Sequence, residues 1–143
     1  MGLPTLADFL GSWLRQASNC ASQDLAHRLA PKGVTVAEWE VLWTLYEAPT
    51  SPSVVATDLS IDRGAITRLA DRLIKKGLLV RQPNKADRRA QILALTRKGS
   101  ALAQELLALA EQGEAELKTR IKAKPYAAMV RLLGKFVDAH NHD

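Results

Sequence analysis

The segment PNKADRRA, residues 83–90, places three basic side chains between two apolar stretches. Pro, Asn and Asp are typical of tight turns, and the flanking stretches have the length and apolar content of strands. The pattern therefore predicts a short hairpin with Lys85, Arg88 and Arg89 at its tip. Like charges placed so close together repel one another, so we expect a negatively charged partner opposite the tip.

A second set of basic side chains lies on one face of the helix predicted for residues 63–76. Gly64 and Arg68 lie in line with Lys75 on that face. An arginine can donate two hydrogen bonds to guanine, and small residues let a helix come close to bases in a major groove. Taken alone, this face is equally consistent with a solvated charged surface. The opposite face carries an apolar stripe at helical spacing, which consists of Ile66, Leu69, Ala70, Leu73 and Ile74.

Positive charge is concentrated in one part of the chain. Residues 61–99 hold eleven Lys and Arg against three Asp, a net charge of +8. The rest of the chain holds nine basic and twelve acidic residues, a net charge of −3. A basic segment in a mildly acidic body is typical of a protein that binds a polyanion.

Helix-ending and helix-capping residues divide the chain into elements. Pro31 and Gly33 end a long first helix, and Thr35 with Glu38 forms a capping box that begins the second. The predicted elements are helices at 5–30, 35–47, 53–59 and 63–76, strands at 79–82 and 91–95, and helices at 96–122 and 126–139. This order predicts a mainly α fold, in which the third and fourth helices form a helix-turn-helix and the hairpin forms a wing.

A wing beside a recognition helix would overhang the adjacent minor groove of DNA. A narrow minor groove concentrates negative potential and attracts inserted arginines, a role that suits Arg88 and Arg89, while Lys85 suits a phosphate. Asp87 has two interpretations that can hold together. It could pair with a neighbouring arginine and direct its side chain, or it could cap the turn, since Asn84 and Asp87 are both turn formers.

Residues 66–99, ITRLADRLIKKGLLVRQPNKADRRAQILALTRKG, resemble the winged-helix core of the MarR family of bacterial transcription regulators. The resemblance extends upstream through VTVAEWEVLWTL and covers residues 8–137; one departure is Val55-Ala56, where the family usually has Leu-Ala. It implies a winged helix-turn-helix DNA-binding lobe at 35–96, flanked by N- and C-terminal dimerisation helices at 5–30 and 97–139. It also implies a homodimer that reads a pseudo-palindromic operator in double-stranded DNA.

The resemblance assigns roles to individual residues. The family's Asp-x-Arg wing motif falls on Asp87 and Arg89, which suggests that Arg89 enters the minor groove and Asp87 orients it. Thr67, at the edge of the helix face, could bind a phosphate or pack on a thymine methyl. The candidate recognition-helix residues are Arg63, Gly64, Ala65, Thr67, Arg68, Arg72 and Lys75, and the candidate wing residues are Lys85, Asp87, Arg88 and Arg89.

Many members of the family are repressors released by small aromatic or phenolic acids. The resemblance suggests a ligand pocket lined by tryptophans, with a basic residue as anion partner, although each tryptophan is also well explained as core. The candidate pocket residues are Trp13, Arg15, His27, Trp39 and Trp43. Other members sense oxidants through a cysteine in the first helix, but the single cysteine, Cys20, lacks a resolving partner, and we expect it to be a buried structural thiol.

The sequence also bears on other classes of protein. A winged-helix module that binds an acidic protein partner is an alternative that would use the same basic face. No Gly-rich phosphate loop, His/Asp/Glu cluster or nucleophile–base spacing indicates an enzyme. Neither a cofactor nor a metal site is expected, since His140 and His142 lie in a terminal stretch without partner cysteines. No apolar run approaches the ~20 residues of a membrane span, and the N-terminus lacks the pattern of a signal peptide. We therefore expect a cytoplasmic protein.

Overall fold

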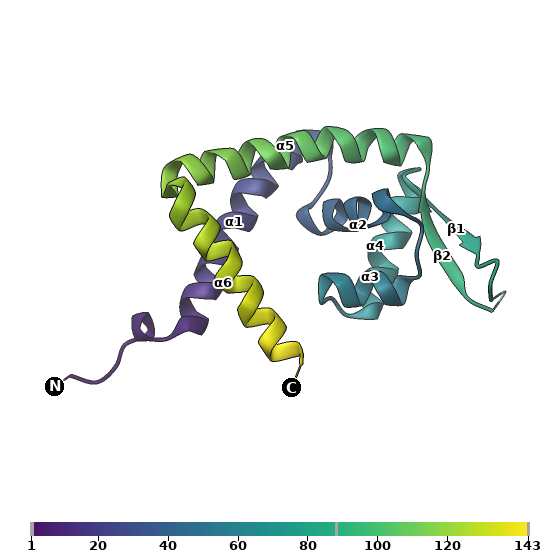
Figure 1. Ribbon diagram of the computed structural model, residues 1–143. Coiled ribbons are helices and arrows are strands. Elements are labelled where there is room, and N and C mark those ends of the chain that lie inside the picture. Colours follow the sequence, from purple (N-terminus) through teal and green to yellow (C-terminus); the bar gives the residue numbers. More distant parts are fainter. Residues whose placement is uncertain (1, 88, 143) are drawn as a thin grey trace. The chain divides into compact units, whose positions relative to one another are not determined.

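The structure is a computed structural model that describes residues 2–87 and 89–142. It is mainly helical, with one two-stranded antiparallel hairpin (Figure 1). The elements are a 3₁₀ turn at Leu6–Asp8, α1 (Leu10–Leu29), a second 3₁₀ turn at Ala30–Lys32, α2 (Val36–Glu47), α3 (Pro52–Leu59), α4 (Arg63–Lys75), β1 (Leu79–Pro83), β2 (Gln91–Leu95), α5 (Arg97–Ile121) and α6 (Ala123–Asn141). The predicted order of elements is confirmed. In the described residues, no helix combines the length and apolar content needed to cross a membrane.

The chain forms two compact units, one that ends at Leu109 and one that begins at Ala110. In the first unit, α2 contacts α1, α3, α4 and β2. Its core is built from side chains with no exposed surface, contributed by the end of α1, the helices α2 to α4, β2 and the first half of α5. They are Leu29, Val41, Leu42, Val55, Ile66, Leu73, Leu93, Ala103 and Leu106. This core fixes the positions of the helix-turn-helix and the hairpin. Figure 1 shows α2, α3 and α4 grouped beside the two strands.

Local signals start α2, α3 and α4 where the sequence predicts. Thr35 Oγ1 accepts a 3.1 Å hydrogen bond from the Glu38 amide, and the Glu38 carboxylate accepts one of 3.1 Å from the Thr35 amide. The capping box at the start of α2 is therefore confirmed. Ser51 caps α3 through the Val54 amide at 3.2 Å, and Asp62 caps α4 through an amide at 3.1 Å. These bonds satisfy amides that have no partner within the helix.

The hairpin is in register from Leu79 opposite Leu95 to Pro83 opposite Gln91. On its other edge, β2 pairs with Thr50: the Leu93 amide donates to the Thr50 carbonyl at 2.8 Å, and the Thr50 amide donates to the Leu93 carbonyl at 3.2 Å. This bridge ties β2 to the segment just before α3. A short hairpin needs such support to be stable.

Both helices at the ends of the chain begin at different residues from those predicted. The first helix begins at Leu10 and not near residue 5, because Thr5 and Asp8 cap a separate 3₁₀ turn and Phe9 is extended. The last helix begins three residues before the predicted Tyr126, so Pro125 lies in its first turn. Proline is tolerated there because the amides of the first turn have no intrahelical acceptor.

The second unit contains the end of α5 and all of α6. In its described residues α6 has no buried side chain. Large apolar side chains of this helix are 40–56% exposed, namely Met129, Val130, Leu132, Leu133, Phe136 and Val137. At the start of the first unit, Leu10 and Trp13 are similarly exposed at 56% and 54%. Apolar surface is therefore uncovered in both units of the single chain.

Candidate nucleic-acid interface

The recognition helix α4 separates its side chains into two faces as the sequence predicts. Its buried residues are Ile66, Leu69, Ala70 and Leu73. Of the seven predicted interface residues, Ala65 is half-buried and the others, Arg63, Gly64, Thr67, Arg68, Arg72 and Lys75, are exposed. The helix therefore holds four cationic side chains on surface that faces solvent.

Gly64 leaves space at the beginning of this helix. A Cβ atom at that position would lie 3.0 Å from Oδ2 of Asp62, the capping oxygen, and 3.5 Å from Nη1 of Arg68. The guanidinium of Arg68 is thus folded toward the N-terminal end of α4. A glycine allows both the cap and this arginine to occupy the first turn without crowding.

Thr67 already uses its hydroxyl proton within the helix. Its Oγ1 donates a 3.1 Å hydrogen bond to the carbonyl oxygen of Arg63. A phosphate oxygen only accepts hydrogen bonds, so a phosphate contact would require this bond to break. Of the two roles predicted for Thr67, packing of its methyl group is the one that the observed conformation favours.

An ion pair that the sequence did not reveal joins the wing to the recognition helix. Nη2 of Arg81 on β1 lies 2.6 Å from Oδ1 of Asp71 on α4. Asp71 flanks the basic face, so its charge is offset where it would otherwise repel DNA. Both residue types were visible in the sequence, but their pairing depends on how the hairpin packs beside the helix.

The tip of the wing carries exposed Lys85 and Arg89, and Arg88 lies outside the described residues. Oδ1 of Asp87 accepts a 3.0 Å hydrogen bond from the Arg89 amide, and Oδ1 of Asn84 accepts one of 2.9 Å from an amide two residues on. The turn-capping role of Asp87 is therefore confirmed. The ion pairs of the described residues do not include one between Asp87 and Arg89.

The candidate ligand residues fall into two groups. Trp39 and Trp43 on α2 form a stack with Tyr46, with ring centroids 5.5 Å and 4.9 Å apart, and Tyr46 accepts a hydrogen bond from Gln104 of α5. Trp39 is buried, which favours a core role for it, while Trp43 is half-buried. Tyr46 was predicted on the same helix face as Trp43, three residues away, but was not included among the candidate pocket residues.

The remaining candidates, Trp13, Arg15 and His27, are exposed on α1. Trp13 donates from Nε1 to the carbonyl of Ala7 at 2.7 Å, and no ring contact among the described residues joins it to the α2 stack. The expectation of a buried Cys20 is wrong for the single chain, where this residue is exposed. That expectation rested on the absence of a resolving cysteine, which carries no information about burial, and α1 has only Ser12 and Leu29 buried.

A basic recognition helix in a helix-turn-helix, followed by a hairpin wing, defines a winged helix-turn-helix protein. A family profile described as the MarR family matches residues 32–90. Apo wild-type MarR from E. coli is 30% identical, with a TM-score of 0.76, over 95% of this chain and 98% of that one. The chain belongs to the MarR family of transcription regulators.

Two further solved structures resemble the chain closely. A mutant MarR from E. coli complexed with operator DNA is 31% identical, with a TM-score of 0.82, and the match covers 89% of this chain and 92% of that one. BpsR from Bordetella bronchiseptica, whose regulation of DNA binding by 6-hydroxynicotinic acid has been described, is 27% identical. Its TM-score is 0.88, and the match covers 96% of this chain and 99% of that one.

Proposed function

We propose that this chain is a sequence-specific DNA-binding repressor that acts in the cytoplasm as a homodimer on a pseudo-palindromic operator. The observation that carries the proposal is the exposed basic face of α4, with the wing tied beside it by the Arg81–Asp71 pair. A helix that buries one face and offers arginines on the other suits a major groove. The E. coli relative that was crystallised with operator DNA supports this assignment.

The interface has two parts with different tasks. On α4, Arg68 is the base-reading residue, with Gly64 and Ala65 allowing close approach and Thr67 offering its methyl group. Arg63, Arg72 and Lys75 bind phosphates on either side of the groove. On the wing, Arg89 enters the minor groove and Lys85 binds a phosphate, while Asp87 holds the turn that presents them. Arg88 belongs to the same tip in the sequence.

The homodimer is supported by the apolar surface that a single chain leaves exposed. The described residues of α6 expose several large apolar side chains, and so do the residues before and within the first turns of α1. Soluble chains rarely leave contiguous apolar patches of this kind uncovered. A second copy of the chain would cover them, with dimerisation residues drawn from 5–30 and 97–139.

Release from DNA by a small aromatic or anionic ligand is the second part of the proposal. BpsR responds to 6-hydroxynicotinic acid, an aromatic acid. In this chain, half-buried Trp43 offers a partly accessible ring for stacking, next to Trp39. Trp13, Arg15 and His27 would contribute from α1, where Arg15 and His27 are exposed and so accessible to an anion.

The proposal is tested by selection from random duplex DNA at two salt concentrations, followed by sequencing. Recovery of a pseudo-palindrome with half-sites about one helical turn apart is the expected outcome. Salt-dependent binding without a motif would instead make the chain a nonspecific DNA-binding protein. Absence of DNA binding would favour a winged-helix module for an acidic protein partner. Sedimentation of the free protein and of the complex gives the number of chains.

A further inference from the structure

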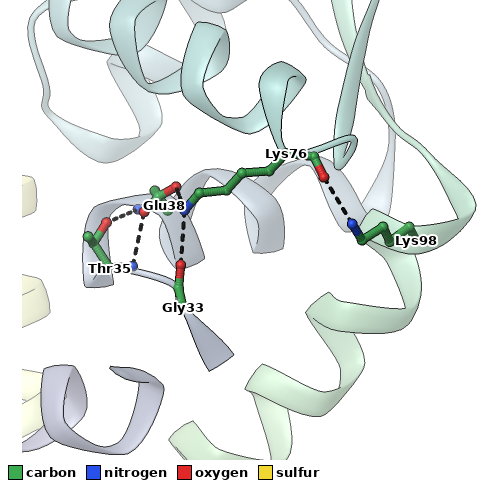
Figure 2. Close-up of polar contacts among 5 residues, drawn as sticks. All are labelled: Gly33, Thr35, Glu38, Lys76 and Lys98. Atoms are coloured by element: carbon green, nitrogen blue, oxygen red, sulfur yellow. Dashed lines mark hydrogen bonds and ion pairs between the residues drawn. The ribbon is translucent and has the colours of Figure 1, made fainter. Parts of the chain in front are cut away.

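Lys76, the residue just after α4, bonds to three separate segments of the first unit (Figure 2). Its Nζ donates to Oε2 of Glu38 at 2.7 Å and to the carbonyl oxygen of Gly33 at 2.9 Å. Its own carbonyl oxygen accepts a 3.1 Å hydrogen bond from Nζ of Lys98. One residue thus joins the end of the recognition helix to the turn before α2 and to the first turn of α5.

Glu38 is almost fully enclosed, with 2% of its surface exposed. Its two carboxylate oxygens serve different elements, because Oε1 accepts from the Thr35 amide and Oε2 from Lys76 (Figure 2). Burial alone would raise the pKa of Glu38, but the hydrogen bonds from Lys76 and Thr35 hold that pKa below its ordinary value. The carboxylate is therefore ionised at neutral pH, and an enclosed charge of this kind needs its cation in place.

The turn that follows Lys76 is fixed to α5 as well. Gly77 has a positive φ of 76°, and its carbonyl oxygen accepts a 2.7 Å hydrogen bond from Thr96 Oγ1. The carbonyl oxygen of Leu78 accepts from the Thr96 amide at 3.1 Å and lies where a side chain at Gly99 would have to be. The C-terminal end of α4 therefore has a defined position relative to both α2 and α5.

We infer that Lys76 and Glu38 are positioning residues for DNA reading. They fix the direction of α4 relative to α2 without contacting DNA, and so set which base edge Arg68 can reach. This inference rests on the proposed function, since it concerns the orientation of the proposed DNA interface. The Lys76 ammonium is held by two acceptors of its own chain, which argues against its use as a phosphate contact.

The test compares Glu38→Gln, Lys76→Met and the double variant with the parent chain. Binding is measured to the selected operator and to an unrelated duplex over a range of salt concentrations. Glu38→Gln is the more informative change, because the amide oxygen can still accept from Thr35 while the negative charge is lost. Lys76→Arg keeps a cation at the site. Glu47→Gln makes the same charge change as Glu38→Gln at an exposed position of α2 and is the matched control.

Operator affinity is expected to fall about tenfold in Glu38→Gln and in Lys76→Met, the scale on which coupled residues act. The double variant should bind the operator no more weakly than the weaker-binding of the two single variants, since both single changes remove the same bond. Glu38→Gln makes the chain more positive, so its affinity for unrelated DNA should hold or rise. Lys76→Arg should retain most of the parent affinity, and Glu47→Gln should change operator affinity less than about twofold.

Circular dichroism at the assay temperature is used to confirm that each variant is folded. Parent-like operator affinity in both single variants would overturn the inference. So would equal losses on operator and unrelated DNA, which indicate a purely structural role. A salt slope reduced by about 1 in Lys76→Met, with Glu38→Gln unaffected, would make Lys76 a phosphate contact. Failure of the parent chain to recover any operator is a distinct result that overturns the proposed function and this inference with it.

Discussion

Arg81 on β1 and Asp71 on α4 form an ion pair of 2.6 Å that connects the wing to the recognition helix. The two side chains are 34% and 54% exposed, so solvent screens much of their attraction. Exposed pairs of this kind stabilise a fold by only about 0.2–1 kcal/mol. The pair therefore matters more for the angle between strand and helix than for the free energy of unfolding.

A double-mutant cycle on this pair should give a small coupling energy. We expect Asp71→Ala and Arg81→Ala, alone and together, to yield a coupling of about 0.2–1 kcal/mol in urea unfolding at low salt. The coupling should shrink at 1 M salt, where charges are screened within about 3 Å. A coupling that is large and insensitive to salt would contradict a screened surface pair.

Gly99→Ala should destabilise the fold through a contact with the main chain. A Cβ at Gly99 would overlap the carbonyl oxygen of Leu78, which is itself held by the Thr96 amide. Because backbone atoms move less readily than a flexible side chain, we expect a loss of about 1–3 kcal/mol in chemical denaturation. Gly11→Ala is the matched control, since nothing lies within 4 Å of its added Cβ. Gly11 is the second residue of α1, so alanine there should gain no more than the roughly 0.5–1 kcal/mol typical of a helix interior. Equal effects at the two glycines would contradict the overlap.

Stability should fall in acid in a way that depends on Glu38. Its pKa in the folded chain lies below the ordinary value of 4.5, as the hydrogen bonds from Lys76 and Thr35 outweigh the effect of burial. The stabilisation is therefore complete above about pH 4.5 and is lost as pH falls through the folded pKa. The free energy of unfolding, measured in urea from pH 7 to pH 3, should fall less steeply with decreasing pH in Glu38→Gln than in the parent.

Glu40 on the same helix provides a control of opposite sign. Burial raises the pKa of Glu40 above its ordinary value. The contribution of Glu40 to the stability of the fold is therefore present at low pH and is lost as pH rises through its pKa in the folded chain. In Glu40→Gln the free energy of unfolding should fall in acid at least as steeply as in the parent, and the chain should be more stable at neutral pH. A smaller loss of stability in acid in Glu40→Gln than in the parent would show that Glu38 is not responsible for the acid dependence.

Much of the DNA-binding lobe could be predicted because its signals are local. The Thr35–Glu38 box, the cap at Asp62 and the stripe along residues 63–76 each depend on spacing within one helix. The same holds for the turn at Asp87, whose carboxylate bonds an amide two residues away. Such contacts are encoded within a few residues of the chain, so their spacing alone is informative.

The contacts that sequence reasoning missed are those between elements. Glu38 and Lys76 are 38 positions apart, and Arg81 meets Asp71 only because the hairpin lies beside α4. Nothing in the spacing of these residues distinguishes a paired charge from a solvated one. The exposure of Cys20 was missed for another reason, because the lack of a resolving cysteine argues against redox sensing but does not indicate burial.

Arg89→Ala should weaken binding to all DNA sequences. The slope of log affinity against log salt concentration should fall by about 1, because one cation near the phosphates is lost. Binding is measured by fluorescence anisotropy from low to moderate salt. Arg89→Lys separates charge from shape, since it should keep the slope of the parent while losing the planar fork of the guanidinium. An unchanged affinity and slope in Arg89→Ala would show that the wing does not reach the DNA.

Arg68→Ala should have a different effect, confined to one position of the operator. Arg68 lies on the exposed face of α4, folded toward the small residues at its N-terminal end. In the proposed interface this end of the helix is the one closest to the bases. Loss of a bidentate contact to guanine costs about 1–3 kcal/mol and removes the preference at that base pair in each half-site. Selection from random DNA with the variant measures this directly, position by position. If every position keeps the preference of the parent, Arg68 binds the backbone and not a base.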